Sequence, residues 1–277
     1  MRPGVTLPRR RCGTIAFPGS LYTVGMSARP YMLAESNWRE VQATRFEVAV
    51  LPWGATEAHN YHLPYGTDTI QVEGIAAEAA RLAWESGTKV IVLPAVPFGC
   101  QSGQMDIPLC VNMSPTTQLA VLTDIAASLA GQGITKLVLL NGHGGNEFKA
   151  IVRELSLRVK IAVCVVNWYQ VVEAKGYFES PGDHAGELET SVTMHLRPDL
   201  VRPLSEAGDG AEKRLKAGGF REGWAWMPRH WRSASADTGI GDPRASRAAK
   251  GEAYFRAVCA KLAAFVREFA TDGGGYA

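Results

Sequence analysis

The 277-residue chain lacks the cysteine pattern of a disulfide-stabilised or zinc-knuckle protein. Its five cysteines are scattered, odd in number and never spaced C-x-x-C, so we expect reduced, mainly structural thiols and a cytoplasmic location. No apolar run approaches the roughly 18 residues that a membrane-spanning helix needs. The chain also lacks an excess of either charge, because 29 Lys and Arg face 27 Asp and Glu. This balance gives no reason to expect a nucleic-acid partner.

Residues 1–25 lack acidic side chains and any periodic apolar pattern, and they contain four arginines. We expect them to form a disordered extension, with a basic targeting arm as the alternative, and residues 26–277 to form a single domain. Pro18 and Gly19 interrupt the stretch after the arginines, which argues against a secretory signal. Without the four arginines the formal charge of +2 becomes −2, so the mild basicity belongs to this stretch.

The rest of the chain alternates apolar strands with helices. We predict strands at 46–52, 89–94, 136–141 and 161–166, and helices at 70–85, 116–132, 147–159 and 245–269. Strands that are apolar throughout are buried on both faces, which predicts a three-layer α/β/α sandwich with a mostly parallel central sheet. In such a sheet, ligands bind beyond the carboxyl ends of the strands.

Four of the six histidines lie in three short polar segments that also contain carboxylates. The first segment follows strand 46–52 and contains Glu57, His59, His62 and Asp68. The second is the run Asn-Gly-His-Gly-Gly-Asn at 141–146, and the third, at 183–191, contains His184, Glu187 and Glu189. Imidazole and carboxylate ligands together suit Zn²⁺, Mn²⁺ or Fe²⁺. The segments therefore predict a metal site at the strand exits.

The spacing of these residues indicates which side chains can converge. Glu57 and His59 are two apart and share one face of an extended segment. His184 and Glu187 are three apart and would share one face if they open a helix. Three carboxylates with two or three imidazoles exceed the needs of one tetrahedral ion, so a pair of ions bridged by Asp68 accounts for the count. Glu189 alternates with Glu187, and we interpret it as structural or as supporting a ligand.

Each segment has a plainer explanation when taken alone. The glycine-rich run at 141–146 could bind phosphate at a helix N-terminus, although it lacks the G-x-G-x-x-G spacing and no P-loop lysine follows. His184 could simply cap a helix. The occurrence of all three segments in one chain favours the metal site.

Taken in order, the motifs resemble those of the creatininase (creatinine amidohydrolase) family over about residues 35–270. They are Leu51-Pro-Trp-Gly-Ala-Thr-Glu-Ala-His59, His62-Leu-Pro-Tyr-Gly-Thr-Asp68, Asn141-Gly-His-Gly-Gly-Asn146 and His184-Ala-Gly-Glu-Leu-Glu-Thr-Ser191. The resemblance implies a three-layer α/β/α fold, two divalent metal ions per subunit (Zn²⁺, Mn²⁺ or Fe²⁺) and a hexamer built as a trimer of dimers. By position, it implies that the metal ligands are Glu57, His59, Asp68, His143 and Glu187. It also implies for His184 either proton transfer or support of a ligand, and we predict that Glu187 and His184 are catalytic, with His184 as the proton carrier.

One position departs from creatininase itself, in which a glutamate ligand stands where this chain has Gly145. The chain resembles instead the branch that takes its carboxylate from the His-Ala-Gly-Glu segment, so we do not expect creatinine as the substrate. That branch includes formamide-cleaving enzymes, a peptide-trimming enzyme and hydrolases of cyclic keto-polyols.

We predict a metal-dependent hydrolase that uses a hydroxide activated by two metal ions on a small cyclic or formyl amide, cleaving a C–N bond other than a peptide bond. The alternatives are a C–C hydrolase that opens a cyclic keto-polyol of the keto-inositol type, and an inactive binding protein of the same fold. The Trp- and Arg-rich segment 219–231 could be a lid over the substrate or an oligomer interface, and the loop 101–106 can also reach the pocket. Our candidate substrate-binding residues are Trp168, Tyr169, Arg221, Trp224, Trp226 and His230.

Overall fold

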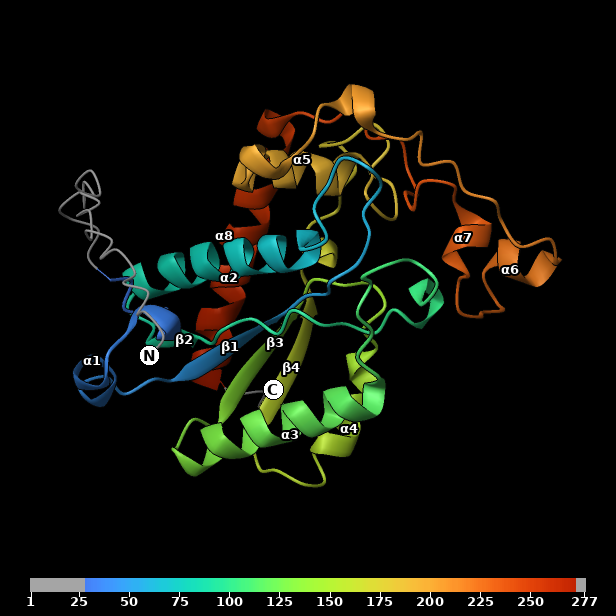
Figure 1. The fold of residues 1–277 in the computed structure, drawn as a ribbon. Coiled ribbons are helices and arrows are strands. Elements are labelled where there is room, and N and C mark those ends of the chain that lie inside the picture. Colours follow the sequence, from blue (N-terminus) through green and yellow to red (C-terminus); the bar gives the residue numbers. More distant parts are fainter. Residues whose placement is uncertain (1–27, 273–277) are drawn as a thin grey trace, which may run out of the picture.

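The computed structural model describes residues 28–272, so the predicted extension at 1–25 lies outside the described residues. At its centre is a parallel sheet with the strand order β2-β1-β3-β4 (Figure 1). The strands are β1 (Val48–Trp53), β2 (Val90–Val92), β3 (Lys136–Asn141) and β4 (Ala162–Asn167). All three strand pairs are parallel, as the uniformly apolar strands predict.

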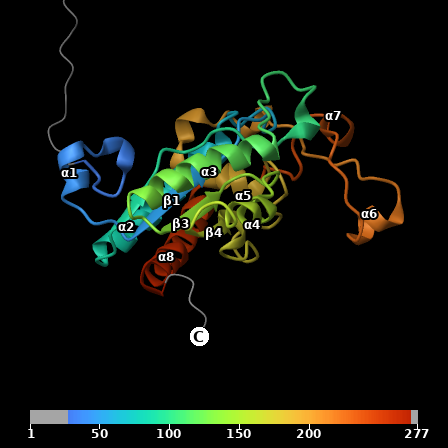
Figure 2. The same ribbon diagram turned by 90° about the horizontal axis from the view of Figure 1, so that it is seen from below.

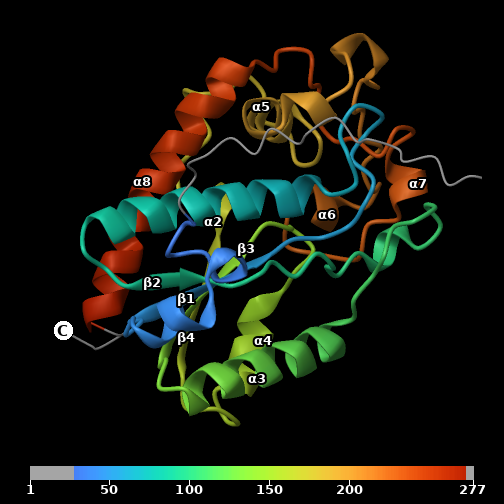
Figure 3. The ribbon, with the colours of Figure 1, turned by 60° about the vertical axis from the view of Figure 1, so that its left-hand side comes forward.

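Helices cover both faces of this sheet, which gives three layers (Figures 1 and 3). One face packs against α2 (Thr67–Glu85) and α8 (Ala248–Asp272), with α5 (Glu187–Leu196) packed on these two helices, and the other face packs against α3 (Pro115–Gly131) and α4 (Phe148–Leu155). Side chains alternate along each strand, so Val48 and Val50 enter the first core while Ala49 and Leu51 enter the second. The three-layer α/β/α sandwich is therefore confirmed.

Short elements complete the described chain. They are α1 (Trp38–Gln42), α6 (Gly218–Glu222), α7 (Trp231–Ala234) and the 3-10 turns η1 (Leu33–Glu35), η2 (Ser102–Gln104), η3 (Trp168–Gln170), η4 (Pro198–Leu200) and η5 (Leu204–Glu206). The segment around α6 projects from the body at the end away from α1 (Figures 1 and 2). Within residues 28–272, no helix combines the length and apolarity that crossing a membrane requires.

Several helix boundaries differ from the prediction, and that of α2 matters for the site. Helix α2 begins at Thr67, three residues before the predicted start, so Asp68 lies within its first turn. Helix α4 ends at Leu155, four residues before the predicted end at 159. After Ser156 the side chain of Leu157 points to solvent and is 82% exposed, because the chain there already turns towards β4.

The strand order fixes where a ligand can bind. Strand β1 lies between β2 and β3, so the chain leaves β1 towards one edge and later crosses back to the other. The winding therefore reverses between β1 and β3, and the carboxyl ends of such a pair of strands form the usual crevice for ligands. The segments that leave these two strands carry Glu57, His59 and His143.

Candidate metal centre

The exit of β1 packs directly against the first turn of α2. A Cβ at Gly54 would lie 2.7 Å from the backbone nitrogen of Thr69, so only glycine permits this approach. As a result, Asp68 in α2 faces Glu57 and His59 in the extended segment after β1. His143, which follows β3, completes this side of the site.

Four of the predicted ligands lie together and are buried. Glu57 Oε1 lies 2.9 Å from Nδ1 of His143. The two oxygens of Asp68 face different imidazoles, since Oδ1 is 3.0 Å from Nε2 of His59 and Oδ2 is 3.0 Å from Nδ1 of His143. Glu57, His59 and Asp68 are at most 1% exposed and His143 is 7% exposed. Asp68 thus occupies the central position that a bridging ligand needs.

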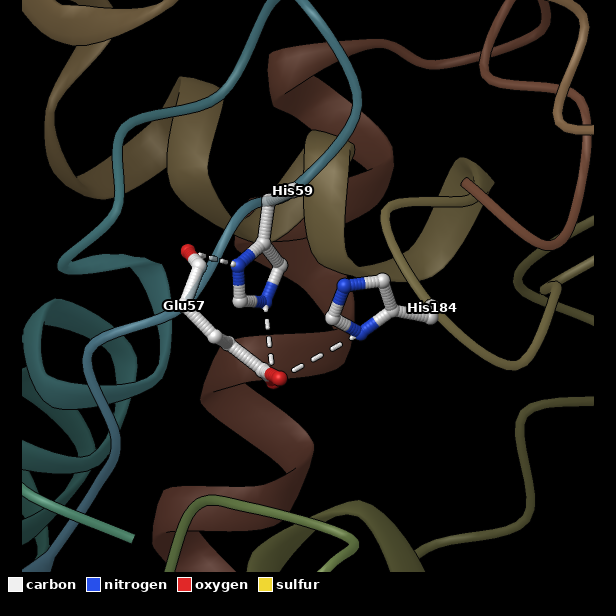
Figure 4. Close-up of side chains that lie close together, drawn as sticks. All are labelled: Glu57, His59 and His184. Carbon is white, nitrogen blue, oxygen red and sulfur yellow. Dashed lines mark hydrogen bonds and ion pairs between the residues drawn. The ribbon is translucent and has the colours of Figure 1, made fainter. Parts of the chain in front are cut away.

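His184 approaches the same carboxylate from the loop before α5 (Figure 4). Its Nδ1 lies 3.7 Å from Oε1 of Glu57, and its ring centroid is 4.1 Å from that of His59. The loop is held by paired backbone hydrogen bonds between His184 and Ile240, at 3.0 and 2.7 Å. The backbone therefore fixes where this imidazole enters the site.

All three imidazoles have their outer ring nitrogen against a backbone carbonyl. His59 Nδ1 lies 3.1 Å from the carbonyl of Glu57, His143 Nε2 lies 3.1 Å from that of Cys100, and His184 Nε2 lies 2.8 Å from that of Ala58. A carbonyl oxygen only accepts hydrogen bonds, so each outer nitrogen is the donor, and the inner nitrogen of each neutral ring presents a lone pair to the carboxylates.

This donor set fits divalent cations. Inner nitrogen lone pairs facing carboxylate oxygens repel one another unless a proton or a metal ion lies between them. Asp68 Oδ2 is buried and makes no hydrogen bond of good geometry, despite its 3.0 Å approach to His143. A buried carboxylate oxygen that has no hydrogen-bond donor is available to bind a metal ion.

The pKa shifts have the same cause. Burial favours neutral His59, but the charges of Asp68, Glu189 and Glu57 outweigh it and raise its pKa to about 10. His143 is similarly buried, yet Glu57 and Asp68 hold its pKa well above the ordinary value. Burial opposes ionisation of Asp68, but His59 and His143 lower its pKa. The buried carboxylates therefore need positive charge next to them. Without metal, protonated imidazoles supply this charge, and bound metal ions can replace those protons.

Helix α5 brings Glu189 to the cluster, whereas Glu187 faces elsewhere. Glu189 Oε2 lies 3.9 Å from Nε2 of His59 and accepts the backbone N–H of Ala185 at 2.5 Å. Glu187 is fully buried on another side of the helix and accepts Lys250 Nζ at 2.5 Å and two backbone N–H groups, at 2.8 and 2.9 Å. Glu187 therefore does not lie with the other predicted ligands, contrary to our expectation.

The physical reason lies in where the helix begins. Helix α5 begins at Glu187, and Ala185 has a positive φ of 52°, so His184 lies outside the helix and the three-residue spacing gives no shared face. Within an α-helix, residues that are two positions apart are rotated by about 200° around the helix axis. Glu187 and Glu189 therefore point in nearly opposite directions.

The ligand atoms form three groups, within each of which they lie no more than 4.8 Å apart. They are Glu57, Asp68 and His143; His59, Asp68 and Glu189; and Glu57, His59 and His184. The first two groups share only Asp68. The geometry can therefore accommodate two ions with one carboxylate in common.

Gly145 leaves no room for a side chain beside this cluster. A Cβ there would lie 2.5 Å from Nε2 of His143 and would strike the carbonyl oxygen of Cys100. The glutamate that the resemblance implies for creatininase itself would not fit this loop as it stands. A carboxylate from α5 approaches from a different direction and meets no such obstacle.

Of the predicted substrate-binding residues, Tyr169 lies near enough to the cluster to feel its charges. It is half-buried, and burial together with the charges of Asp68 and Glu189 raises its pKa. Trp168 beside it is 1% exposed and belongs to the core under α8. The other four lie on the projecting segment around α6 and α7 and are exposed, with Trp224 at 76% and Trp226 at 82%; they are Arg221, Trp224, Trp226 and His230.

Two residues that the prediction did not single out contact the cluster. The ring centroid of Trp231 lies 4.5 Å from that of His184, and Arg229 lies over the Trp231 ring and pairs with Asp183 at 2.9 Å. Gln104 donates a hydrogen bond to Glu57. The sequence signals were the Trp- and Arg-rich segment and the loop 101–106, but neither indicates which side chain points inward.

A parallel α/β sandwich with a buried imidazole and carboxylate cluster at its switch point has the architecture and the donors of a metal-dependent hydrolase. The family comparison defines it further. The family model Creatininase, described as creatinine amidohydrolase, matches residues 34–266. The chain belongs to this family and is an enzyme of its metal-dependent hydrolase class.

Individual relatives bear several different names. A solved structure from Bacteroides fragilis NCTC 9343, provisionally named a creatinine amidohydrolase, is 45% identical, with a TM-score of 0.84 over 89% of this chain and 98% of that one. The mycofactocin precursor peptide peptidase of Mycolicibacterium smegmatis is 26% identical over 90% of this chain and 95% of its own length. The 3-dehydro-scyllo-inosose hydrolase of Thermotoga maritima is 28% identical over 56% and 52%.

Proposed function

We propose that the protein hydrolyses a C–N bond, other than a peptide bond, in a small cyclic or formyl amide. We propose as metal ligands Glu57, His59, Asp68, His143 and Glu189, which would hold two divalent ions (Zn²⁺, Mn²⁺ or Fe²⁺) with Asp68 shared between them. The observation that carries this proposal is the orientation of the imidazoles, whose outer nitrogens donate to backbone carbonyls while their inner nitrogens face carboxylates.

Bound divalent ions would make hydroxide available near neutral pH and polarise the carbonyl of the substrate. His184 is the proton carrier in our proposal, because an imidazole can accept and donate a proton near neutral pH. Ala58 fixes its ring through Nε2 and leaves Nδ1 directed at the cluster, 3.7 Å from Glu57 Oε1. Trp231 packs against this ring and shields it from water.

Glu187 contributes through its neighbours in this proposal. Its carboxylate binds the backbone N–H groups of Glu179 and Ser180 and the ammonium group of Lys250. These bonds tie the start of the loop that carries His184 to both α5 and α8. We therefore assign Glu187 to positioning, and the reacting atoms to the cluster and His184.

The burial of the cluster supports a small substrate. Glu57, His59, Asp68, His143 and His184 are each at most 7% exposed, and Trp231 covers one side. The second candidate is a C–C hydrolase that opens a cyclic keto-polyol, which the Thermotoga relative's name favours. The same hydroxide could attack such a ring, because a β-dicarbonyl stabilises the leaving carbanion as an enolate.

We also propose a homo-oligomer, a hexamer by the family resemblance. The two large indole rings at Trp224 and Trp226 are largely exposed on the projecting segment, and tryptophan is enriched at protein interfaces. Light scattering on the purified chain at several concentrations measures the assembled mass. A mass equal to one chain at all concentrations would contradict this part of the proposal.

The deciding experiment combines metal analysis with a substrate panel. We expect about two divalent ions per chain, and loss of metal in His143→Ala but not in the matched control His195→Ala, whose ring packs against Phe255 away from the cluster. Turnover is then compared across cyclic amides, formamides, keto-inositols and short peptides. Turnover of keto-inositols alone would favour the second candidate, and a chain that binds no metal would favour the inactive binding protein.

A further inference from the structure

The loop 99–113 is tied to the segment that carries the first glutamate of the cluster. Gln101 donates its amide to the carbonyls of Thr56 and Val111, and the N–H of Val111 donates to Thr56 at 3.1 Å. On the other side of the glutamate, the N–H of Ala58 donates to the sulfur of Cys110 at 3.3 Å. The loop therefore holds the backbone on both sides of Glu57.

Gln104 in this loop reaches the glutamate itself. Its side chain is fully buried, and Nε2 donates to Oε2 of Glu57. Its Oε1 accepts the thiol hydrogen of Cys110 at 3.0 Å. A carboxylate can only accept and a thiol can donate, so this is the orientation of the amide that satisfies both ends. Cys110 thus fixes which end of the amide meets Glu57.

The amide divides the two oxygens of Glu57 between two tasks. Oε2 is occupied by Gln104, while Oε1 faces His143 at 2.9 Å and His184 at 3.7 Å. We infer that Gln104 is a positioning residue that restricts Glu57 to metal binding through Oε1, and that Cys110 holds Gln104 in place. This inference rests on the proposed function, because it requires that the cluster binds metal.

A neutral donor suits this position better than a charged one. An ammonium or guanidinium group on Oε2 would neutralise Glu57 and compete with a metal ion for it. The amide satisfies one oxygen of the buried carboxylate and leaves the negative charge available. The pair thereby orients a ligand without weakening it.

The test uses Gln104→Met, which keeps a similar shape but has no N–H donor, and the control Gln132→Met, which makes the same chemical change at the exposed C-terminal end of α3. Zn²⁺ binding to each full-length, metal-stripped chain is measured by calorimetry, and Co²⁺ substitution is followed by its visible absorption spectrum. We expect Gln104→Met to weaken the binding of one ion by roughly 10–100-fold and to change the Co²⁺ spectrum. Gln132→Met should retain both properties.

Variants of Cys110 test the hydrogen bond from its thiol to the amide of Gln104. Cys110→Ser keeps a donor for the Gln104 amide and should bind Zn²⁺ like the unaltered chain, whereas Cys110→Ala should weaken binding in the same direction as Gln104→Met. Unaltered affinity and spectrum in Gln104→Met, or an equal loss in Gln132→Met, would overturn the inference. Failure of the unaltered chain to bind Zn²⁺ or Co²⁺ would instead overturn the proposed function.

Discussion

Two buried charged regions lie on opposite sides of α5, and they differ in how their carboxylates are satisfied. On one side, Glu187 meets the ammonium group of Lys250 and two backbone N–H groups. On the other side, Glu189 joins Glu57 and Asp68, and the cationic partners that face these three carboxylates are imidazoles. The carboxylate of the first region is therefore fully satisfied by groups of the protein itself.

The difference distinguishes a structural carboxylate from a candidate ligand. The ammonium group of Lys250 neutralises the buried carboxylate of Glu187, so no further cation is needed there. This ion pair offsets the cost of burying the carboxylate on folding. Imidazoles can lose their protons and then offer lone pairs, so the second region can exchange protons for divalent ions. Burial alone would not separate Glu187 from Glu57 and Asp68, whereas the identity of the partner cation does.

The largest expected effect comes from removing the carboxylate that faces both imidazoles. Asp68→Ala should lose both metal ions, and activity should fall on the order of 10³-fold, since the ions supply several kcal/mol of charge stabilisation. Elemental analysis together with turnover measures both quantities. Retention of the full metal content in this variant would contradict the shared position of Asp68.

The next largest effect should separate the two glutamates of α5. Glu189→Gln should lose about one ion per chain and reduce activity on the order of 10²-fold, because it belongs to only one of the two groups that share Asp68. Glu187→Gln is the matched control, as it makes the same chemical change two residues away. If the two variants lost metal equally, the comparison would fail.

Glu187→Gln should instead affect stability. The substitution leaves Lys250 without its buried partner and weakens two backbone hydrogen bonds, so we expect the Tm to fall by roughly 5 °C while the metal content stays unchanged. Calorimetry of the metal-loaded protein gives the Tm, and elemental analysis gives the content. An unchanged Tm would show that the ion pair contributes nothing to the fold.

The smallest expected effect is a pH dependence of the Tm difference between the unaltered protein and Glu187→Gln. Burial acts to raise the pKa of Glu187, but Lys250 and the backbone N–H groups lower it below its ordinary value of 4.5. A carboxylate with a lowered pKa in the folded state stabilises the fold above its ordinary pKa and loses this contribution as the pH falls through the folded value. The Tm advantage over Glu187→Gln should therefore shrink below about pH 4.5.

This comparison is made with metal removed from both proteins, so that the cluster contributes equally and cancels. Thermal unfolding is followed from pH 7 to pH 3. A Tm difference that stayed constant or grew towards acid pH would mean that Glu187 is not held ionised by its partners.

The strand exits allowed much of the cluster to be predicted from sequence. Glu57, His59 and His143 follow strands and Asp68 lies in the first turn of α2, so the parallel topology brings them together almost irrespective of detail. The choice between Glu187 and Glu189 depended on the first residue of α5, which the positive φ of Ala185 determines. Periodicity contains no signal for such a local backbone angle.

The contacts of Gln104 and Trp231 were beyond sequence reasoning for a different reason. Each lies in an irregular loop, and each meets a cluster residue 47 positions away along the chain, as in Gln104 with Glu57 and Trp231 with His184. No period links such residues. Their inward direction follows from hydrogen bonds and ring packing between loops, which only the folded chain contains.

The tight contact at Gly145 has an evolutionary consequence. A side chain there would collide with the Cys100 carbonyl. If the final carboxylate comes from helix α5, as we propose, a glutamate placed in the glycine loop would require this loop to be reshaped at the same time. A single substitution at Gly145 would therefore crowd the loop before it could supply a ligand.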